Sequence, residues 1–192
     1  KESKLKLDSA INNLNKALSL KADNSQALDL KNQINQQSSS IRQQFSVSEF
    51  PLFLDLDLIK KGFSADKMSL SVGEILLLDS NTETLITINL SKKSNRILAG
   101  ESQLGKSEYA SINGEMAFVY SFDKGIVRVD ISNKEVIIVA KTDEEWGNIG
   151  DITAFASNVY LLDTTKGQIW KYLPTTDGYS DKREYLTKNA KV

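Results

Sequence analysis

Apolar positions in the first 45 residues recur at helical spacing. One apolar residue falls in each turn of the opening stretch: Leu7, Ile11, Leu14 and Leu18. The polar residues 22–25 interrupt this stripe and offer three helix caps: Asp23, Asn24 or Ser25. A second stripe follows the break: Ala27, Leu30, Ile34, Ile41 and Phe45. The pattern predicts two antiparallel helices joined by a short turn over residues 1–45.

The spacing of apolar residues changes to every second position after residue 50. The alternation at 52–59 places four leucines on one side: Leu52, Leu54, Leu56 and Leu58. This pattern predicts a strand at 52–59 within a linker that spans 46–66. Asp55 and Asp57 would then share the other side. We interpret them as charges that guard an edge strand, with metal binding as the alternative.

From residue 67 onward the chain repeats itself at a spacing of 42 residues. Three apolar segments mark the repeat: 74–79, 116–121 and 158–163. Each unit divides into four strand candidates, separated by turn residues such as Asn113-Gly114. The units are expected at about 67–108, 109–150 and 151–192. An insertion at 174–182 separates the last strand of the third unit, expected at 184–187, from the rest.

A fixed period near 40 residues with four short strands per unit is typical of propeller blades. We therefore predict a mainly β protein: a partial beta-propeller of three four-stranded antiparallel blades, with an N-terminal α-helical hairpin. A closed propeller needs roughly four to eight blades. We expect further blades, or a second copy of the chain, to close the ring, and strand 52–59 to complete a blade from outside.

Two stretches resemble known families. The segments EILLLDSNTETLITINL, AFVYSFDKGIVRVDI and VYLLDTTKGQIWKYL are similar to the second-and-third-strand hairpins of bacterial beta-propellers of the NHL and YVTN-repeat type. Residues 10–28 resemble a tetratricopeptide repeat, although Ala22 stands where that family usually has proline. The propeller resemblance implies a scaffold that binds proteins, sugars or small molecules around its axis. It transfers no functional residue, because the family's signature residues are missing here.

Composition excludes several function classes. The chain has 24 basic and 25 acidic residues, so no net field attracts nucleic acid. It contains neither cysteine nor histidine, which excludes disulfides, thiol nucleophiles, Ser-His-Asp catalysis and His-ligated zinc. We therefore expect no catalytic residue, no metal site and no cofactor in this chain. No apolar run is long enough to span a membrane.

These observations favour a non-catalytic binding or interaction module for a protein, peptide or glycan ligand. Two alternatives remain: a sensory or regulatory segment of a larger protein whose catalytic domain lies outside this chain, and a carboxylate-based propeller enzyme. The first residue is Lys1, so we expect the chain to be part of a longer protein. We favour an extracytoplasmic or cell-surface location over the cytoplasm.

Loops between successive blades supply the candidate binding residues. The loop that follows the second blade presents an aromatic ring beside an amide and a carboxylate: Trp146, Asn148 and Asp151. The corresponding loops add aromatic and acidic groups: Phe63, Asp66, Glu108 and Tyr109. Such groups suit a sugar or a peptide. The alternative is that Trp146 packs between blades, as we expect for Trp170 and Tyr172.

Acids that end equivalent strands form a second candidate. Asp79 and Asp163 close the second strand of the first and third units, and Ser121 stands at the matching position of the middle unit. A ring of carboxylates could bind Ca²⁺ or a sugar. We favour the other interpretation, in which each side chain caps its own turn.

Overall fold

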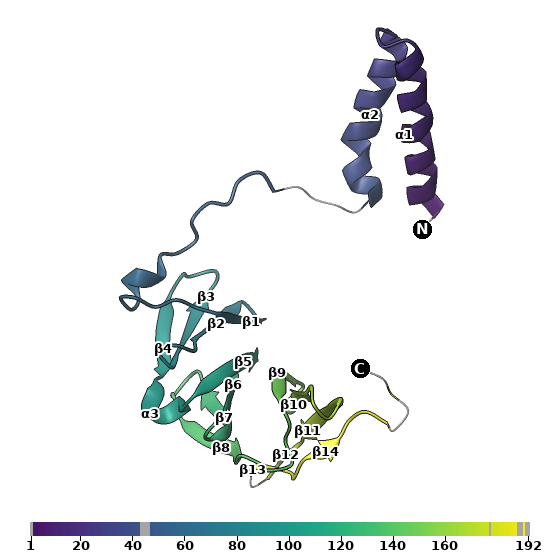
Figure 1. The fold of residues 1–192 in the computed structure, drawn as a ribbon. Coiled ribbons are helices and arrows are strands. Elements are labelled where there is room, and N and C mark those ends of the chain that lie inside the picture. Colours follow the sequence, from purple (N-terminus) through teal and green to yellow (C-terminus); the bar gives the residue numbers. More distant parts are fainter. Residues whose placement is uncertain (1, 43–46, 177, 188–189, 191–192) are drawn as a thin grey trace. The chain divides into compact units, whose positions relative to one another are not determined.

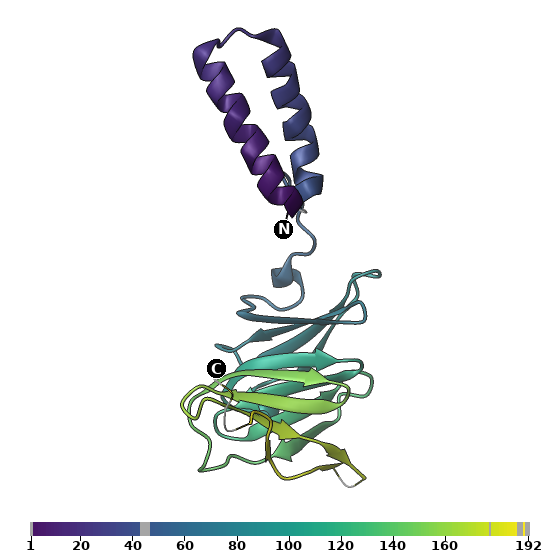
Figure 2. The ribbon, with the colours of Figure 1, turned by 90° about the vertical axis from the view of Figure 1, so that its right-hand side faces the viewer.

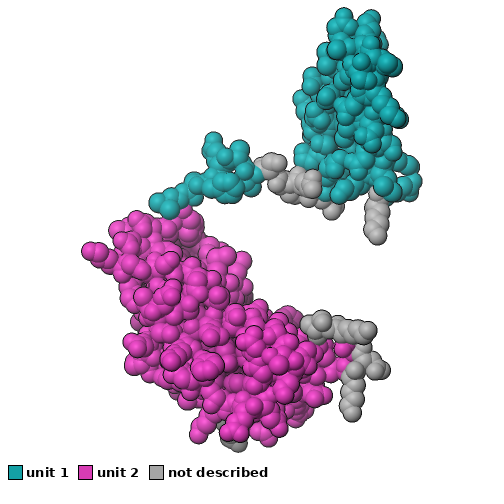
Figure 3. All heavy atoms as spheres, viewed as in Figure 1, with its two compact units in different colours: residues 1–52 teal, residues 53–192 magenta. Residues whose placement is uncertain are grey.

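The computed structural model describes residues 2–42, 47–176, 178–187 and 190. The chain forms two compact units, Lys1–Leu52 and Phe53–Val192 (Figure 3). The predicted boundary between the hairpin and the linker, at 45/46, lies outside the described residues. Each unit is described separately below.

The first unit contains the predicted helical hairpin. Helix α1 spans Glu2–Leu20 and helix α2 spans Ser25–Arg42. Leu7 and Leu14 are the buried residues of α1, because they face α2. Asn24 caps α2, since its Oδ1 accepts a hydrogen bond from the Ala27 amide at 3.1 Å. An ion pair between Arg42 and Asp8 joins the free ends of the two helices.

The second unit contains three four-stranded antiparallel sheets, called blades 1 to 3 here. Blade 1 comprises β1 (Lys67–Ser71), β2 (Glu74–Asp79), β3 (Thr84–Asn89) and β4 (Asn95–Ala99). Blade 2 comprises β5 (Ser107–Asn113), β6 (Met116–Ser121), β7 (Gly125–Asp130) and β8 (Val136–Ala140). Blade 3 comprises β9 (Ile149–Phe155), β10 (Asn158–Asp163), β11 (Gln168–Tyr172) and β14 (Arg183–Glu184). A short helix, α3 (Glu101–Leu104), links blades 1 and 2.

The blades follow one another in an arc with β1, β5 and β9 on its inner side (Figure 1), and Figure 2 shows them stacked as layers. The hydroxyl of Ser69 accepts a hydrogen bond from the Ile112 amide at 3.1 Å. Ser111 accepts the corresponding bond from Ala154, also at 3.1 Å. The spacing of 42 residues therefore reproduces one inter-blade hydrogen bond at both junctions.

Apolar side chains fill both junctions. The core between blades 1 and 2 is aliphatic and includes Leu78, Leu85 and Val127. The core between blades 2 and 3 contains the aromatic residues, including Trp170 and Tyr172, which are both buried as predicted. Along each strand, the side chains on the face that meets a neighbouring blade are thus the buried ones.

The prediction of a strand at 52–59 is wrong. Residues 56–58 form a single turn of 3₁₀ helix, η1 (Leu56–Leu58), because the Asp55 carboxylate accepts a hydrogen bond from the Asp57 amide at 3.0 Å. Leu54 and Leu56 pack with Phe63 against one face of blade 1. The segment therefore covers blade 1 through its side chains and does not extend a sheet.

The third blade also differs in detail from the sequence prediction. Residues of the predicted insertion form an extra two-stranded ladder, β12 (Pro174–Thr175) with β13 (Gly178–Tyr179). The outer strand β14 then pairs with β11 through Lys171 and Arg183, so it begins one residue before the predicted Glu184. Register shifts in β5 and β9 let these inner strands begin two residues before the predicted blade starts, at Ser107 and Ile149.

Candidate functional site

The acids that end the second strand of blades 1 and 3 act as structural clamps. Asp163 is fully buried, and its carboxylate accepts hydrogen bonds from the Lys166 amide of its own turn at 2.9 Å and from the Trp170 indole at 3.0 Å. It also accepts one from the Gly147 amide, at 2.8 Å, in the loop before the blade. Burial would raise the pKa of Asp163, but these hydrogen bonds hold the pKa below its ordinary value.

Asp79 has the same environment in blade 1. Its carboxylate accepts from the Asn81 and Thr82 amides of its turn and from the Ser64 amide at 3.0 Å. The hydrogen bonds that these carboxylates accept agree with the capping interpretation. Among the described residues there is also no group of three or more acidic side chains that could hold a metal ion.

Trp146 packs between blades 2 and 3. Its indole N–H donates to the Tyr172 hydroxyl at 3.1 Å, and its ring meets the Tyr120 ring edge-on with centroids 6.0 Å apart. This is the packing alternative stated for Trp146. Asn148 lies at the surface beside it. Its side-chain amide donates to the Thr164 hydroxyl, and that hydroxyl donates to the Asn148 backbone carbonyl.

Of the other predicted site residues, Tyr109 packs on the same Tyr120 ring as Trp146, and the rest lie elsewhere. Phe63 is buried against blade 1, and Asp66 bonds to the amide and hydroxyl of Ser80. Tyr109 stacks at a tilt on Tyr120, with centroids 6.4 Å apart, and Glu108 is exposed. Asp151 is exposed on β9, the inner strand of blade 3. The structure therefore does not gather these side chains into one pocket.

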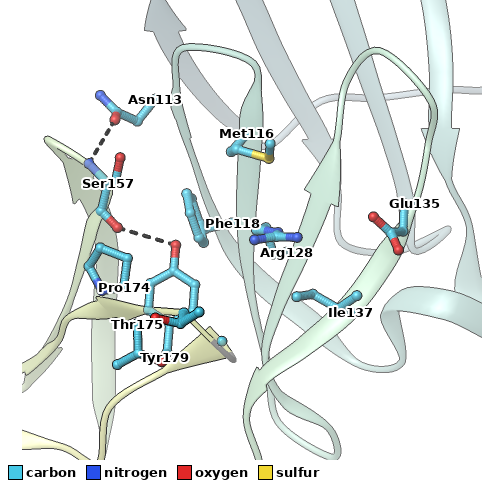
Figure 4. Close-up of a pocket in the computed structure, with 12 residues that line it drawn as sticks. Asn113, Met116, Phe118, Arg128, Glu135, Ile137, Ser157, Pro174, Thr175 and Tyr179 are labelled. Carbon is cyan, nitrogen blue, oxygen red and sulfur yellow. Dashed lines mark hydrogen bonds between the residues drawn. The ribbon is translucent and has the colours of Figure 1, made fainter.

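A hollow of about 530 Å³ lies at the opposite end of the junction between blades 2 and 3 (Figure 4). One wall comes from blade 2, and the other comes from the β12–β13 ladder and Ser157 of blade 3. We call it the interblade pocket and define it by these residues: Asn113, Met116, Phe118, Arg128, Glu135, Ile137, Ser157, Pro174, Thr175, Thr176, Gly178 and Tyr179. None of the seven predicted site residues lines it.

Arg128 supplies the positive charge of the interblade pocket. It lies on β7, between Phe118 on β6 and Ile137 on β8 in the cross-strand register, and Figure 4 shows its guanidinium between these two side chains. Its Nε is buried and has no hydrogen-bond partner in the part of the chain that the structure describes. Within the described residues, Arg128 makes no ion pair.

Tyr179 closes the pocket from the side of blade 3. Its ring meets the Phe118 ring edge-on, with centroids 6.1 Å apart, and its hydroxyl donates to the Ser157 carbonyl at 3.2 Å. Burial raises the pKa of Tyr179, and the charge of Arg128 opposes that rise. The tyrosine is therefore a neutral hydrogen-bonding group at neutral pH.

The pocket combines an apolar wall, one cation, the carboxylate of Glu135 and several neutral polar groups. Such a combination binds and orients a ligand, because the apolar surface supplies affinity and the polar groups select the pose. The sequence offered one signal for this pocket, the insertion at 174–182, but the sequence alone predicts only a longer loop there.

Neither α1 nor α2 has the length and apolarity required to cross a membrane.

No protein-family model matches the chain, and no curated protein matches its sequence. Solved structures do resemble it. An auxiliary nutrient binding protein from Bacteroides ovatus ATCC 8483 matches 65% of this chain and 32% of its own, with 7% identity and a TM-score of 0.50. A nidogen/laminin complex matches 66% and 49%, with 14% identity and a TM-score of 0.49.

A Bacteroides thetaiotaomicron VPI-5482 protein of unknown function matches 62% of this chain and 33% of its own, with 18% identity and a TM-score of 0.47. This chain thus spans between a third and a half of the length of these proteins. The similar structures are beta-propeller-like, and the second unit has the fold of a partial beta-propeller.

Proposed function

We propose that the blades form a non-catalytic binding module and that the interblade pocket is its ligand site. The observation that carries this proposal is Arg128, a cation without an ion pair among the described residues, in a hollow of about 530 Å³. A hollow of that volume suits a small ligand or a few groups of a larger one. The ligand class is a protein or peptide segment or a glycan.

Catalysis is the weaker proposal for this pocket. Among the described lining residues Glu135 is the only acid, so that part of the pocket does not supply the pair of carboxylates that a glycosidase needs. The chain also has no histidine or cysteine to act as a base or nucleophile.

A binding screen with two matched variants tests the module. The complete chain is applied to peptide and glycan arrays, and Thr175→Trp fills the pocket from an exposed position on β12. Asn81→Trp, at an exposed turn of blade 1, is the control. We expect Thr175→Trp to lose array binding at least tenfold and Asn81→Trp to keep it. Equal binding by the two variants would remove the interblade pocket as the ligand site.

The finer family relationships belong to the same proposal. The strand-turn-strand segments support a propeller of the NHL or YVTN-repeat type, and α1 with α2 supports a tetratricopeptide-like hairpin. Leu20, Leu28 and Leu30 are exposed on that hairpin, which suits contact with a further helix or a partner protein. We retain the extracytoplasmic or cell-surface location as part of this proposal.

A further blade is the partner proposed for the inner strands. Met68 and Leu70 on β1 are 72% and 63% exposed. The positions 42 residues later, Ala110 and Ile112, pack into the core between blades 1 and 2. At the other end of the arc, Thr153 is exposed and stands where Ser69 and Ser111 accept the inter-blade hydrogen bonds. Both ends of the arc thus expose inner-strand positions that a blade of the same repeat could cover. That blade would come from a second copy or from further chain.

A further inference from the structure

We infer that the interblade pocket binds a carboxylate, with Arg128 as its anchor and an apolar group of the ligand against Phe118 and Tyr179. This inference rests on the proposed function and specifies its ligand. It begins with the unusual state of one side chain, the Arg128 guanidinium.

The Arg128 charge is partly removed from water. Phe118 and Ile137 flank it in the cross-strand register, and its Nε is buried without a partner. A cation in such surroundings lacks part of its hydration, so a nearby negative charge stabilises it more than at the open surface. The two Nη atoms carry four further N–H donors, which suit the two oxygens of a carboxylate.

The described neighbouring acids form no ion pair with Arg128, although its charge lowers the pKa of Asp130. Asp130 lies two residues along the same strand, but its carboxylate accepts from the amides of Ser132 at 2.7 Å and Asn133 at 3.1 Å. Glu135 lines the pocket, yet within the described part of the chain it forms no ion pair with Arg128. Figure 4 shows Glu135 apart from the guanidinium. An external carboxylate can therefore take the place of a counter-charge.

The residues in the same cross-strand register of the other blades have partners. They lie 41 and 43 residues from Arg128, because the turn between β6 and β7 is one residue shorter than the corresponding turns of blades 1 and 3. In blade 1 the position is Thr87, opposite Leu76, and its hydroxyl donates to Glu74 at 2.8 Å. In blade 3 it is Lys171, opposite Tyr160, and its ammonium lies 5.4 Å from the Tyr160 ring centroid and 5.7 Å from that of Tyr185. Of the three positions, only that of blade 2 combines an unpartnered buried donor atom with a cover, the β12–β13 ladder.

The charge of the pocket favours a carboxylate over a phosphate. In the part of the lining that the structure describes, Arg128 is the only basic residue and Glu135 contributes one negative charge. A phosphate monoester carries nearly two negative charges and normally needs several cations or amides. The rings of Phe118 and Tyr179 meet edge-on at one wall, so an aromatic group beside the carboxylate can add a third ring.

A pair of probes that differ only in charge tests this inference. N-acetyl-L-phenylalanine and N-acetyl-L-phenylalaninamide are titrated against the complete chain by ligand-observed NMR, up to about 10 mM because a fragment of this size binds in the millimolar range. We expect the acid to bind at least tenfold more tightly than the amide. Equal binding of the two, or binding of neither, would overturn the inference.

Three variants assign the effect to the residues named. Arg128→Gln should remove the preference for the acid, and Glu135→Gln should strengthen acid binding several-fold because it removes a competing negative charge. Arg128→Lys keeps the positive charge but lacks the planar guanidinium that can bind both carboxylate oxygens. It should retain part of the preference for the acid. Circular dichroism checks that each variant is folded. A folded Arg128→Gln chain that still prefers the acid would contradict the assignment, as would a Glu135→Gln chain with weaker acid binding.

The carboxylate can come from a peptide C-terminus or from an acidic side chain. A hexapeptide that ends in free phenylalanine is compared with its amidated form and with an amidated form that carries aspartate beside the phenylalanine. Binding of either acidic peptide over the neutral one supports the inference and identifies the source. Equal binding of all three overturns it.

The array experiment separates this inference from the proposed function. If Thr175→Trp abolishes array binding while Arg128→Gln leaves it unchanged, the pocket is the ligand site but a carboxylate is not the ligand. If Thr175→Trp leaves array binding unchanged, the site itself is wrong. The two failures therefore give different results with the same two proteins.

Discussion

The hydroxyl of Ser121 donates a hydrogen bond to the Asp123 carboxylate at 2.7 Å. In blades 1 and 3 the position of Ser121 is an aspartate that clamps the preceding loop. In blade 2 the Asp123 carboxylate does this instead, because it accepts from the Lys106 amide at 2.8 Å. The clamp is therefore present in all three blades, although the acid has moved by two residues.

Loss of the clamp in blade 3 should destabilise the fold. Asp163→Asn replaces one acceptor oxygen by an N–H₂ group that faces the donors of Gly147 and Trp170. We expect the free energy of unfolding to fall by about 3 kcal/mol, measured by urea denaturation. Asp123→Asn is the comparison and should cost less, since Asp123 is exposed. The opposite order of the two costs would contradict the clamp.

Stability should also decrease in acid. Hydrogen bonds hold the pKa values of Asp79 and Asp163 below their ordinary value in the folded chain. Each group therefore stabilises the fold above the unfolded pKa of about 4, and this contribution disappears as pH falls through the lower folded pKa. We expect the melting temperature to drop below about pH 4 and to drop less in Asp163→Asn. Parallel pH curves for the two proteins would exclude Asp163 as a source.

Two glycines with positive φ should differ in their tolerance of a side chain. A Cβ on Gly125 would lie 2.2 Å from the Ala140 carbonyl oxygen, whereas a Cβ on Gly114 would meet nothing within 4 Å. Gly114→Ala should cost about 1 kcal/mol, through its φ of 59° alone. Gly125→Ala should cost at least about twice that, because β7 and the chain after β8 must separate. Thermal unfolding measures both, and equal costs would contradict the close approach.

Trp146→Ala should lower stability by about 3 kcal/mol, as for a truncated aromatic in a core. Its ring packs on Tyr120, and its N–H bonds to Tyr172. Trp146→Phe keeps much of the packing and should cost about 1 kcal/mol for the hydrogen bond. A Trp146→Ala chain with unchanged melting temperature but weaker ligand binding would instead restore the sequence-based binding prediction.

Light scattering at micromolar concentration tests the proposed contact between blades. We expect a mass above that of the monomer for the 192-residue chain, and a return to the monomer in Leu70→Lys or Thr153→Lys. Phe122→Lys, at an exposed turn of blade 2, is the control and should not change the mass. A stable monomer that binds no hydrophobic dye would refute the open-ring interpretation.

Periodicity predicted the parts of the fold that depend on repeated side-chain burial. The spacing of 42 residues located three blades, and the alternation around Trp170 and Tyr172 identified inter-blade core. Alternation failed at 52–59, because Asp55 caps a turn there and a local hydrogen bond outweighs the pattern of leucines.

The interblade pocket was beyond sequence reasoning for another reason. In the sequence, Arg128 has the pattern of an ordinary polar residue of a strand. Its environment depends on Tyr179, which the β12–β13 ladder places against blade 2. Of the predicted site residues, Tyr109 and Trp146 meet on Tyr120, as parts of the core between blades 2 and 3. The polar ones do not join them because their polar groups already hold the loops together, as Asn148 does with Thr164.

The repeated hydrogen bond between blades has a direction. An amide of each inner strand donates to a hydroxyl on the inner strand of the preceding blade. Ser69 and Ser111 accept, Ile112 and Ala154 donate, and the two sides of a blade are therefore not interchangeable. Copies joined through such a contact associate head to tail. After each new junction, the assembly still has one end that can accept this hydrogen bond and one end that can donate it. Growth stops at two chains if each blade turns the path by about 60°, the angle of a six-bladed ring. The angle between blades thus determines whether association gives a closed ring or an open filament.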